Sequence, residues 1–223
     1  NQIINKNNRI FVSGYFGRDV FKFDDFFKMS WGNATGTVRW NHLFSEKLFA
    51  NLSLIYSNYD YSLGVPTGAQ AFDWKSNIIN YSPKVDFGYY LNNKHTINFG
   101  ASTIFYDFNP GTVQPTSPDS QFNYKQLDKK YALESAFYVE AQHELSKKVT
   151  VSYGLRYSMF YRLGEQTLNV YENNQAVIFN PVFQIYESAT PTGTVSYKKN
   201  ETIANFDNWE PRLGISYAFN DDQ

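Results

Sequence analysis

The clearest pattern in the chain is a long alternation of apolar and polar positions over 149–163. One set of positions is apolar throughout: Val149, Val151, Tyr153, Leu155, Tyr157, Met159 and Tyr161. The set between them is polar or small, with Phe160 as the exception: Thr150, Ser152, Gly154, Arg156, Ser158 and Arg162. A period of two predicts a β-strand with one apolar and one polar face. Strands in soluble proteins usually run to about five or six residues, so this length favours a membrane-barrel wall with lipid outside and water inside.

Seven further segments show the same alternation, so the sequence predicts an all-β chain of about eight strands. The expected strands are 9–18, 34–44, 48–59, 76–91, 95–107, 130–143, 149–163 and 208–219. Short turns and long loops alternate between them: turns at 45–47, 92–94, 146–148 and 220–222, and loops at 19–33, 60–75, 108–128 and 164–207. Turns at one end and loops at the other are typical of an antiparallel up-and-down transmembrane β-barrel, whereas Greek-key sandwiches mix loop lengths at both ends.

The apolar positions also predict how neighbouring strands pair, because a slip of one residue would turn every side chain to the wrong face. Matching apolar with apolar gives three opposed pairs: Trp40 with Leu52, Phe87 with Phe99, and Phe137 with Leu155. These registers give each hairpin a turn of odd length, such as the three-residue type. Pro83 lies inside one expected strand, where its missing N–H predicts a bulge.

Composition agrees with a barrel but does not require one. Aromatic residues make up 19% of the chain, with 18 Tyr and 20 Phe, and Tyr and Trp favour water–lipid interfaces. The net charge of −1 argues against a nucleic-acid partner, which would need a basic stripe. Mean hydropathy is −0.49, and no apolar run approaches the roughly 20 residues of a membrane helix. A membrane β-barrel is expected to give the same values, since lumen residues dilute the lipid-facing ones.

Motifs for catalysis are missing from the chain. Without cysteine there are no disulfides, thiolate nucleophiles or Cys metal sites. No Gly-x-Ser-x-Gly, P-loop or His-Glu-x-x-His motif occurs. We therefore expect no enzyme activity, no cofactor and no metal. The first residues lack the basic and apolar regions of a signal peptide, so we expect a mature protein or a fragment.

Charged side chains at the polar positions of the expected strands form the first candidate site. They would face the lumen: Arg39, Glu134, Glu140, Arg156, Arg162 and Arg212. The expected register makes Glu134 a diagonal neighbour of Arg156, which predicts a ladder of opposite charges. An outer-membrane hydrolase could use paired carboxylates such as Glu134 and Glu140, but a solvated lumen wall is the favoured interpretation.

The three histidines, His42, His95 and His143, fall on apolar positions a few residues from short turns. This places all three at one rim of the expected barrel. They are far apart in the sequence and have no carboxylate pattern beside them, so we interpret them as interfacial side chains rather than metal ligands.

The long loops are the second candidate site, because binding residues concentrate on loops held by a rigid scaffold. Aromatic and acidic side chains there would contact a sugar, a peptide or a metal chelate: Asp24, Asp25, Trp31, Asp60, Tyr61, Asp73, Trp74, Tyr171 and Tyr186. The alternative is that these side chains only pack the loops and keep them soluble.

Four segments together resemble the barrel of TonB-dependent outer-membrane receptors, particularly the Bacteroidota type. They are WGNATGTVRWNHLFSEKLFANLSLIYSNYDY (31–61), NNKHTINFGASTIFYDFNPG (92–111), YALESAFYVEAQHELSKKVTVSYGLRYSMF (131–160) and NWEPRLGISYAFNDDQ (208–223). They cover most of the expected strands. Such sequence patterns are characteristic of the family as a whole, and they do not indicate the substrate.

The resemblance implies a barrel of about 22 strands in the outer membrane, surrounded by lipid and filled by an N-terminal plug. It also implies a TonB box that engages the energising TonB–ExbB–ExbD complex, and import of a ligand bound by loops and lumen. A surface lipoprotein or a larger outer-membrane complex would be a further partner. The chain shows no plug, no TonB box and no terminal aromatic strand, so we expect 1–223 to be a middle portion of the barrel domain.

Three alternatives remain open at this point. A complete eight-stranded barrel with a structural or adhesive role would pair its last strand with its first. A non-transporting barrel would serve as a scaffold in an outer-membrane assembly. A soluble, aromatic-rich β protein would pack Phe137, Leu155 and Tyr157 into a protein core.

Overall fold

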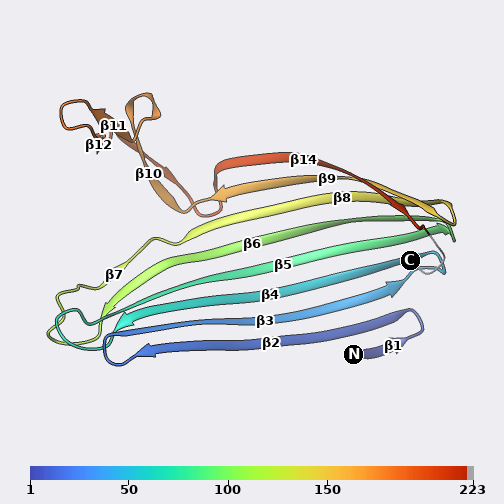
Figure 1. Cartoon of the computed structure of the whole chain (residues 1–223), viewed down its shortest axis with the longest axis horizontal. Coiled ribbons are helices and arrows are strands. Elements are labelled where there is room, and N and C mark those ends of the chain that lie inside the picture. Colours follow the sequence, from blue (N-terminus) through green and yellow to red (C-terminus); the bar gives the residue numbers. More distant parts are fainter. Residues whose placement is uncertain (220–223) are drawn as a thin grey trace.

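Backbone pairing in the computed structural model, which describes residues 1–219, forms one antiparallel meander (Figure 1). The wall strands are β1 Gln2–Asn5, β2 Asn8–Phe23, β3 Phe27–Leu43, β4 Leu48–Val65, β5 Phe72–Asn92, β6 His95–Pro115, β8 Lys130–Ser146, β9 Val149–Leu163 and β14 Thr202–Tyr217. Each strand pairs with the next along the chain, and short β7 (Lys125–Gln126) adds to β6. The prediction of an all-β, antiparallel up-and-down fold is confirmed.

An arm lies between β9 and β14 and consists of two antiparallel strand pairs, of which the second lies between the two strands of the first in the sequence. Its elements are β10 Gln166–Val170, η1 Glu172–Asn174, β11 Val177–Asn180, β12 Ile185–Ser188 and β13 Gly193–Tyr197. β10 pairs with β13, and β11 pairs with β12 at the tip. Figure 1 shows the arm projecting beyond the loop ends of β8 and β9, at the upper left. None of the helical turns in 1–219 is long or apolar enough to cross a membrane.

The wall has an apolar face and a polar face, because the ladder carries the sequence alternation from strand to strand. One row of opposed residues is apolar from β2 to β14: Ile10, Trp40, Leu52, Val85, Ala101, Phe137, Tyr157 and Trp209. The adjacent row on the other face is polar or small: Arg9, Asn41, Asn51, Asp86, Gly100, Tyr138, Arg156 and Glu210. Period-two strands therefore give the sheet two chemically distinct surfaces.

The apolar face is not covered by other parts of the described chain. Within 1–219 the buried apolar side chains are few and mostly small: Ala50, Ala71, Ala136 and Leu163. Phe137 and Leu155, by contrast, are 56% and 41% exposed. A soluble protein would bury them, so the structure argues against the soluble alternative.

The strands are longer than the sequence predicts at the loop end. The expected loop 19–33 is instead a hairpin, in which β2 and β3 pair from Asn8↔His42 to Phe23↔Phe27. The expected loop 60–75 likewise narrows to 66–71, between β4 and β5. Aromatic and charged residues occur on both faces in these segments, so the polarity contrast fades while backbone pairing continues. The expected turn at 220–222 lies outside the described residues.

Two of the three predicted registers are confirmed. Trp40 lies opposite Leu52, and Phe87 lies opposite Phe99. The third is wrong by two residues, since Phe137 lies opposite Tyr157 rather than Leu155.

The turn between β8 and β9 explains this shift. It closes as a two-residue turn in which Ser146 pairs with Val149, after a register shift between Glu144 and Ser146. The Ser146 hydroxyl accepts hydrogen bonds from the amides of Lys148 and Val149, each at 3.2 Å. The β5–β6 hairpin also has a two-residue turn, with Asn92 opposite His95. Of the three hairpins within 1–219 for which an odd turn was predicted, the one at 45–47 has it, and there Phe44 N–H donates to the Leu48 carbonyl.

Pro83 does not form the predicted bulge. On one side Leu54 faces Pro83 in an unbroken register between β4 and β5. On the other side, pairing between β5 and β6 lapses near Pro83 and resumes in the same register, with Tyr81 opposite Phe105 and Lys84 opposite Ser102. The missing N–H removes local ladder bonds without inserting a residue.

The two outer edges of the wall differ. β1 covers the short-turn end of β2, with Gln2 opposite Ile10 and Asn5 opposite Asn8. β14 pairs with β9 alone. Over residues 1–219, β2 and β14 are not hydrogen-bonded to each other.

Candidate functional site

The polar face carries a belt of charged and hydroxyl side chains across β5, β6, β8, β9 and β14. Asp86, Gly100, Tyr138, Arg156 and Glu210 follow one another as direct partners in successive strands. Strand alternation aims the side chains of this row at the same side of the sheet. We call this row, together with the side chains bonded to it, the polar belt.

Tyr138 joins three strands at the start of the belt. Its ring lies over Gly100 of β6, where an added Cβ would come within 2.8 Å of ring carbon Cε1. Its hydroxyl donates a 2.6 Å hydrogen bond to Asp86 Oδ1 on β5. Lys84 Nζ lies 3.0 Å from the same carboxylate oxygen. The lack of a side chain at Gly100 therefore allows β8 to bond directly to β5, two strands away.

Glu210 forms the centre of a second cluster at the other end of the belt. Its Oε1 accepts a 2.5 Å hydrogen bond from the Ser158 hydroxyl, which in turn accepts a 3.0 Å bond from Arg156 Nε. Arg156 and Arg212 lie 3.9 Å and 3.5 Å from its carboxylate oxygens. The carboxylate thus accepts one hydroxyl hydrogen bond and lies between two guanidinium groups of opposite charge.

A shallow depression of about 210 Å³ lies between the two clusters. It is lined mainly by polar-belt side chains and their neighbours: Lys84, Ser102, Tyr138, Glu140, Gly154, Arg156 and Arg212. Its charges and hydroxyls suit contact with a hydrophilic solute rather than an apolar one. The histidines project from the other face, so within 1–219 no imidazole reaches this depression to act as a base.

The charged residues predicted to face a lumen all lie at polar-face positions of the ladder, but their contacts differ from the prediction. Glu134 lies opposite Phe160, while Arg156 lies opposite Tyr138, so the expected Glu134–Arg156 ladder is wrong. The two-residue register shift is the reason.

The predicted polar-face residues contact other side chains instead. Glu134 accepts a 3.2 Å bond from the Tyr106 hydroxyl, and the Arg39 guanidinium lies 4.5 Å above the Phe11 ring centre. Arg162 donates a 2.7 Å bond to Gln166, at the root of the arm. Glu140 and Arg212 face each other across Gly154 and complete the rim of the depression.

Most of the residues predicted to bind a ligand from loops lie in strands instead. Trp31 is in β3, Asp60 and Tyr61 in β4, and Asp73 and Trp74 in β5. Trp31 and Tyr61 are direct partners across the ladder. These assignments to loops are wrong, because the strands extend past the region of clear alternation.

Three of the four aspartates in this set lie beside an arginine or lysine side chain. Arg18 Nη2 lies 2.7 Å and 2.6 Å from the two Asp60 oxygens and reaches them over Gly32. Lys75 Nζ lies 3.6 Å from Asp73 Oδ2. Lys22 lies 3.3 Å from Asp25 in the β2–β3 turn, where Asp24 has a φ of 43°. The other two predicted residues are on the arm: Tyr171 just before η1, and Tyr186 in β12 with 74% of its surface exposed.

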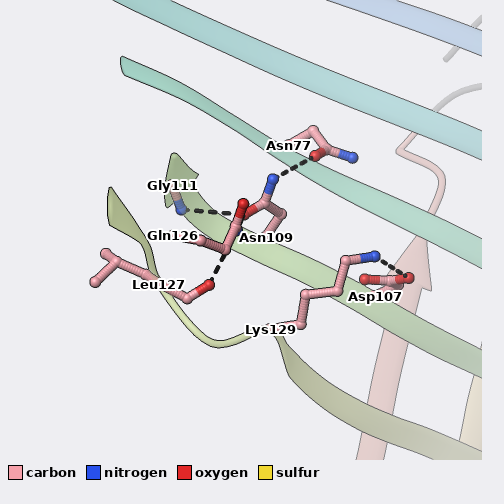
Figure 2. Close-up of polar contacts among 7 residues, drawn as sticks. All are labelled: Asn77, Asp107, Asn109, Gly111, Gln126, Leu127 and Lys129. Atoms are coloured by element: carbon pink, nitrogen blue, oxygen red, sulfur yellow. Dashed lines mark hydrogen bonds and ion pairs between the residues drawn. The ribbon is translucent and has the colours of Figure 1, made fainter. Parts of the chain in front are cut away.

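A polar cluster that sequence reasoning missed ties the loop after β6 to the wall (Figure 2). Asn109 of β6 donates a 3.3 Å bond to Asn77 of β5, and its oxygen accepts bonds from Gly111 N–H at 3.2 Å and Gln126 Nε2 at 3.1 Å. Gly111 has a φ of +155°, and the Trp74 ring fills the space beside it. The Asn and Gly residues of 108–128 signalled a loop, yet here they fix β7 against β6.

Lys129 closes the same loop. Its Nζ lies 3.0 Å from Asp107 Oδ2, as Figure 2 shows. This hydrogen bond raises the pKa of the Lys129 amine above its ordinary value. The loop is therefore anchored at both ends before it enters β8.

The belt residues Lys84, Asp86, Tyr138 and Glu210 were also absent from the predicted site. Their signal was present, because each occupies a polar position of an expected strand. The alternation of apolar and polar positions does not predict that one side chain passes over a glycine and bonds to a strand two places away, as Tyr138 does.

Comparison with known proteins identifies a family. A family model described as an outer membrane beta barrel domain matches residues 105–223, which is just over half of the chain. No curated protein and no solved structure matches the chain.

Proposed function

Since the chain belongs to the outer-membrane β-barrel domain family, we propose that it forms part of the wall of a TonB-dependent receptor barrel that imports a hydrophilic ligand. The chain lies in the outer membrane and crosses it many times through its strands. In this proposal the apolar face contacts lipid, the polar face lines the lumen, and the short turns face the periplasm. The polar belt would then contact the ligand on its passage.

One observation carries the proposal of a barrel larger than eight strands. β1 pairs with β2 at its short-turn end, from Asn8 to Ile10, and so covers the part of the edge where the end of β14 would pair in an eight-stranded ring. Unpaired strand edges are not tolerated in lipid. Both edges of this wall therefore call for further strands, as a receptor-sized barrel would provide.

The polar belt supports a transport lumen over a purely structural barrel. Small barrels fill their interior with packed side chains, whereas Lys84, Glu140 and Arg212 border an open depression. Ion pairs neutralise part of the charge and leave donors and acceptors of both signs on the surface. A sugar, peptide or metal chelate would find hydrogen-bond partners on such a wall.

Spin labels on the two edge strands test the size of the barrel. Residues 1–223 contain no cysteine, so Val12→Cys on β2 and Leu213→Cys on β14 can be labelled selectively once any cysteine elsewhere in the complete protein is replaced. Both sites are exposed, at 68% and 75%. In the complete protein in lipid nanodiscs we expect a separation above roughly 20 Å, since neighbouring strands lie only about 5 Å apart. The control pair is Val12 with Val38, which face each other on β2 and β3. A distance for the β2–β14 pair as short as that of the control would refute the larger barrel.

Energised import requires its own test. The purified periplasmic domain of TonB should bind the complete protein in detergent, and binding should disappear when the TonB box is deleted. Absence of binding together with a large barrel would leave a scaffold as the function, because size and transport are read out separately.

The arm favours a second function, the docking of a surface partner such as a lipoprotein. At its tip, Val182 and Phe183 are 81% and 70% exposed, an arrangement typical of interaction surfaces. A photo-crosslinker in place of Phe183 should give one discrete adduct in intact cells, and a second one placed at exposed Leu145, at the opposite end of the wall, should not. Equal labelling from both positions would count against a partner at the arm.

A further inference from the structure

His95 and His143 form a facing pair of imidazoles at the short-turn rim of the apolar face. His95 opens β6, His143 lies near the end of β8, and the two are direct partners in the ladder. Their ring centres are 4.6 Å apart with the planes at 61°, and the two Nδ1 atoms are in direct contact. Both side chains are half-buried. The backbone register therefore holds two nitrogen donors at one point.

Tyr153 fixes the orientation of one of these rings. Its oxygen lies 2.9 Å from His143 Nε2, and the two rings stack with centres 5.4 Å apart. When Nε2–H donates to this oxygen, the proton is on Nε2 and the lone pair of Nδ1 points at His95. Metal-bound histidines are commonly held in this way by a hydrogen bond to their other nitrogen.

From this geometry we propose that His95 and His143 form a two-imidazole site for a divalent transition-metal ion of the Zn²⁺ or Cu²⁺ class. Two neutral imidazoles can share one proton between facing Nδ1 atoms, but an ion uses both lone pairs at once. Nitrogen ligands bind Zn²⁺ at about 2.0–2.1 Å, so a small rotation of each ring makes room for the ion. Imidazole suits Zn²⁺, Cu²⁺ and Ni²⁺, with Cu²⁺ bound most tightly.

The third histidine shows what an ordinary interfacial histidine looks like in this chain. His42 Nδ1 lies 2.8 Å from Asn8 Oδ1, and its ring packs between Trp40 and Phe44. It has no second imidazole in contact. His42 thus provides a matched control on the same face and at the same rim.

Residues 1–219 contain no cluster of three or more His, Asp or Glu side chains able to hold an ion. The proposed site therefore supplies two protein ligands, and water completes the coordination. The site does not depend on whether the barrel transports.

Copper titration of the complete protein, purified without a polyhistidine tag, tests the proposal. Electron paramagnetic resonance should show one Cu²⁺ per chain with hyperfine structure from two nitrogens. His95→Asn and His143→Asn should each weaken binding at least tenfold, and His42→Asn should leave it unchanged. Tyr153→Phe, which removes a positioning residue, should weaken binding roughly tenfold while the two-nitrogen signal persists.

A measurement on the wild-type protein covers the case in which a variant does not fold. Zn²⁺ should protect His95 and His143, but not His42, from modification by diethylpyrocarbonate. Equal protection of all three histidines, or a copper spectrum unchanged in the His95→Asn and His143→Asn variants, would overturn the site.

Discussion

Leu54 and Ile55 are adjacent on β4 and test which face of the wall meets lipid. Leu54 lies on the apolar face opposite Val38, and Ile55 lies on the polar face opposite Thr37. Replacing either one by arginine removes an apolar side chain of the same size and adds the same charge. The difference between the two variants therefore reports the surroundings of each face.

The depth of Leu54 sets the expected cost. It lies six residues after Leu48, the first residue of β4. A strand that rises about 3.3 Å per residue with a tilt of about 40° gains roughly 2.5 Å of depth per residue, which puts Leu54 about 15 Å from the short-turn end. That position is near the middle of an apolar band about 25 Å tall, where a lipid-facing arginine costs about 2–4 kcal/mol. The folding equilibrium constant should fall roughly 30- to 700-fold.

Ile55→Arg should cost much less. Ile55 borders a depression of about 580 Å³ that is also lined by Arg39, Lys84 and Asp86, so the new guanidinium would meet water and side chains of both charges rather than lipid. Loss of a half-buried apolar side chain accounts for about 1 kcal/mol.

Reversible guanidinium unfolding from phospholipid vesicles, followed by tryptophan fluorescence, measures both variants. The expected order of stability is wild type, then Ile55→Arg, then Leu54→Arg, with the last two separated by at least about 1 kcal/mol. Equal costs, or a larger cost at Ile55, would show that the apolar face packs against protein and that the polar face does not line water.

Three further outcomes follow from the wall and its arm. Gly100→Ala should lower the free energy of unfolding by about 1–3 kcal/mol, since the new methyl would meet the Val85 carbonyl at 2.3 Å. The control is Gly36→Ala, where no atom lies within 4 Å of the added Cβ; it should stay within about 1 kcal/mol of wild type in the same unfolding assay. A double-mutant cycle of Arg18→Ala and Asp60→Ala should give a coupling of about 0.2–1 kcal/mol that shrinks in 1 M salt, because both side chains are partly exposed; a coupling that ignores salt would contradict this. Protease added outside intact cells should cut the chain between β9 and β14 and leave both strands in the membrane fraction, whereas cleavage only after lysis would place the arm on the wrong side.

The strands and their faces could be predicted from sequence because side-chain direction in a strand follows a period of two. The run Val149–Leu163 gave a strand with the bounds that the structure has. The same rule cannot distinguish two strand registers that differ by an even number of residues, because each side chain then stays on the same face. Moving Phe137 from Leu155 to Tyr157 keeps apolar against apolar, so only the turn at Ser146 decides between them.

The candidate site was harder to predict than the wall. Arg156 and Arg212 stood out as charges at polar positions, but Glu210, the carboxylate near both of them, was not selected. Asp60 was assigned to a loop, because the alternation that marks the strand 48–59 ends just before it. In the structure Asp60 lies in β4, and Arg18 of β2 reaches over Gly32 of β3 to form an ion pair with it.

The contact of Tyr138 with Asp86 over Gly100 has a consequence for how the wall assembles. A strand that adds to a growing sheet meets competing alignments two residues apart, and polarity alone does not distinguish them. Moving β8 by two residues would place Tyr138 opposite Asn98 or Ser102, where a side chain blocks the ring and Asp86 is out of reach. The Tyr138–Asp86 contact can therefore form in only one register of β5, β6 and β8. It distinguishes that register from those shifted by two residues, which the alternation of apolar and polar positions does not.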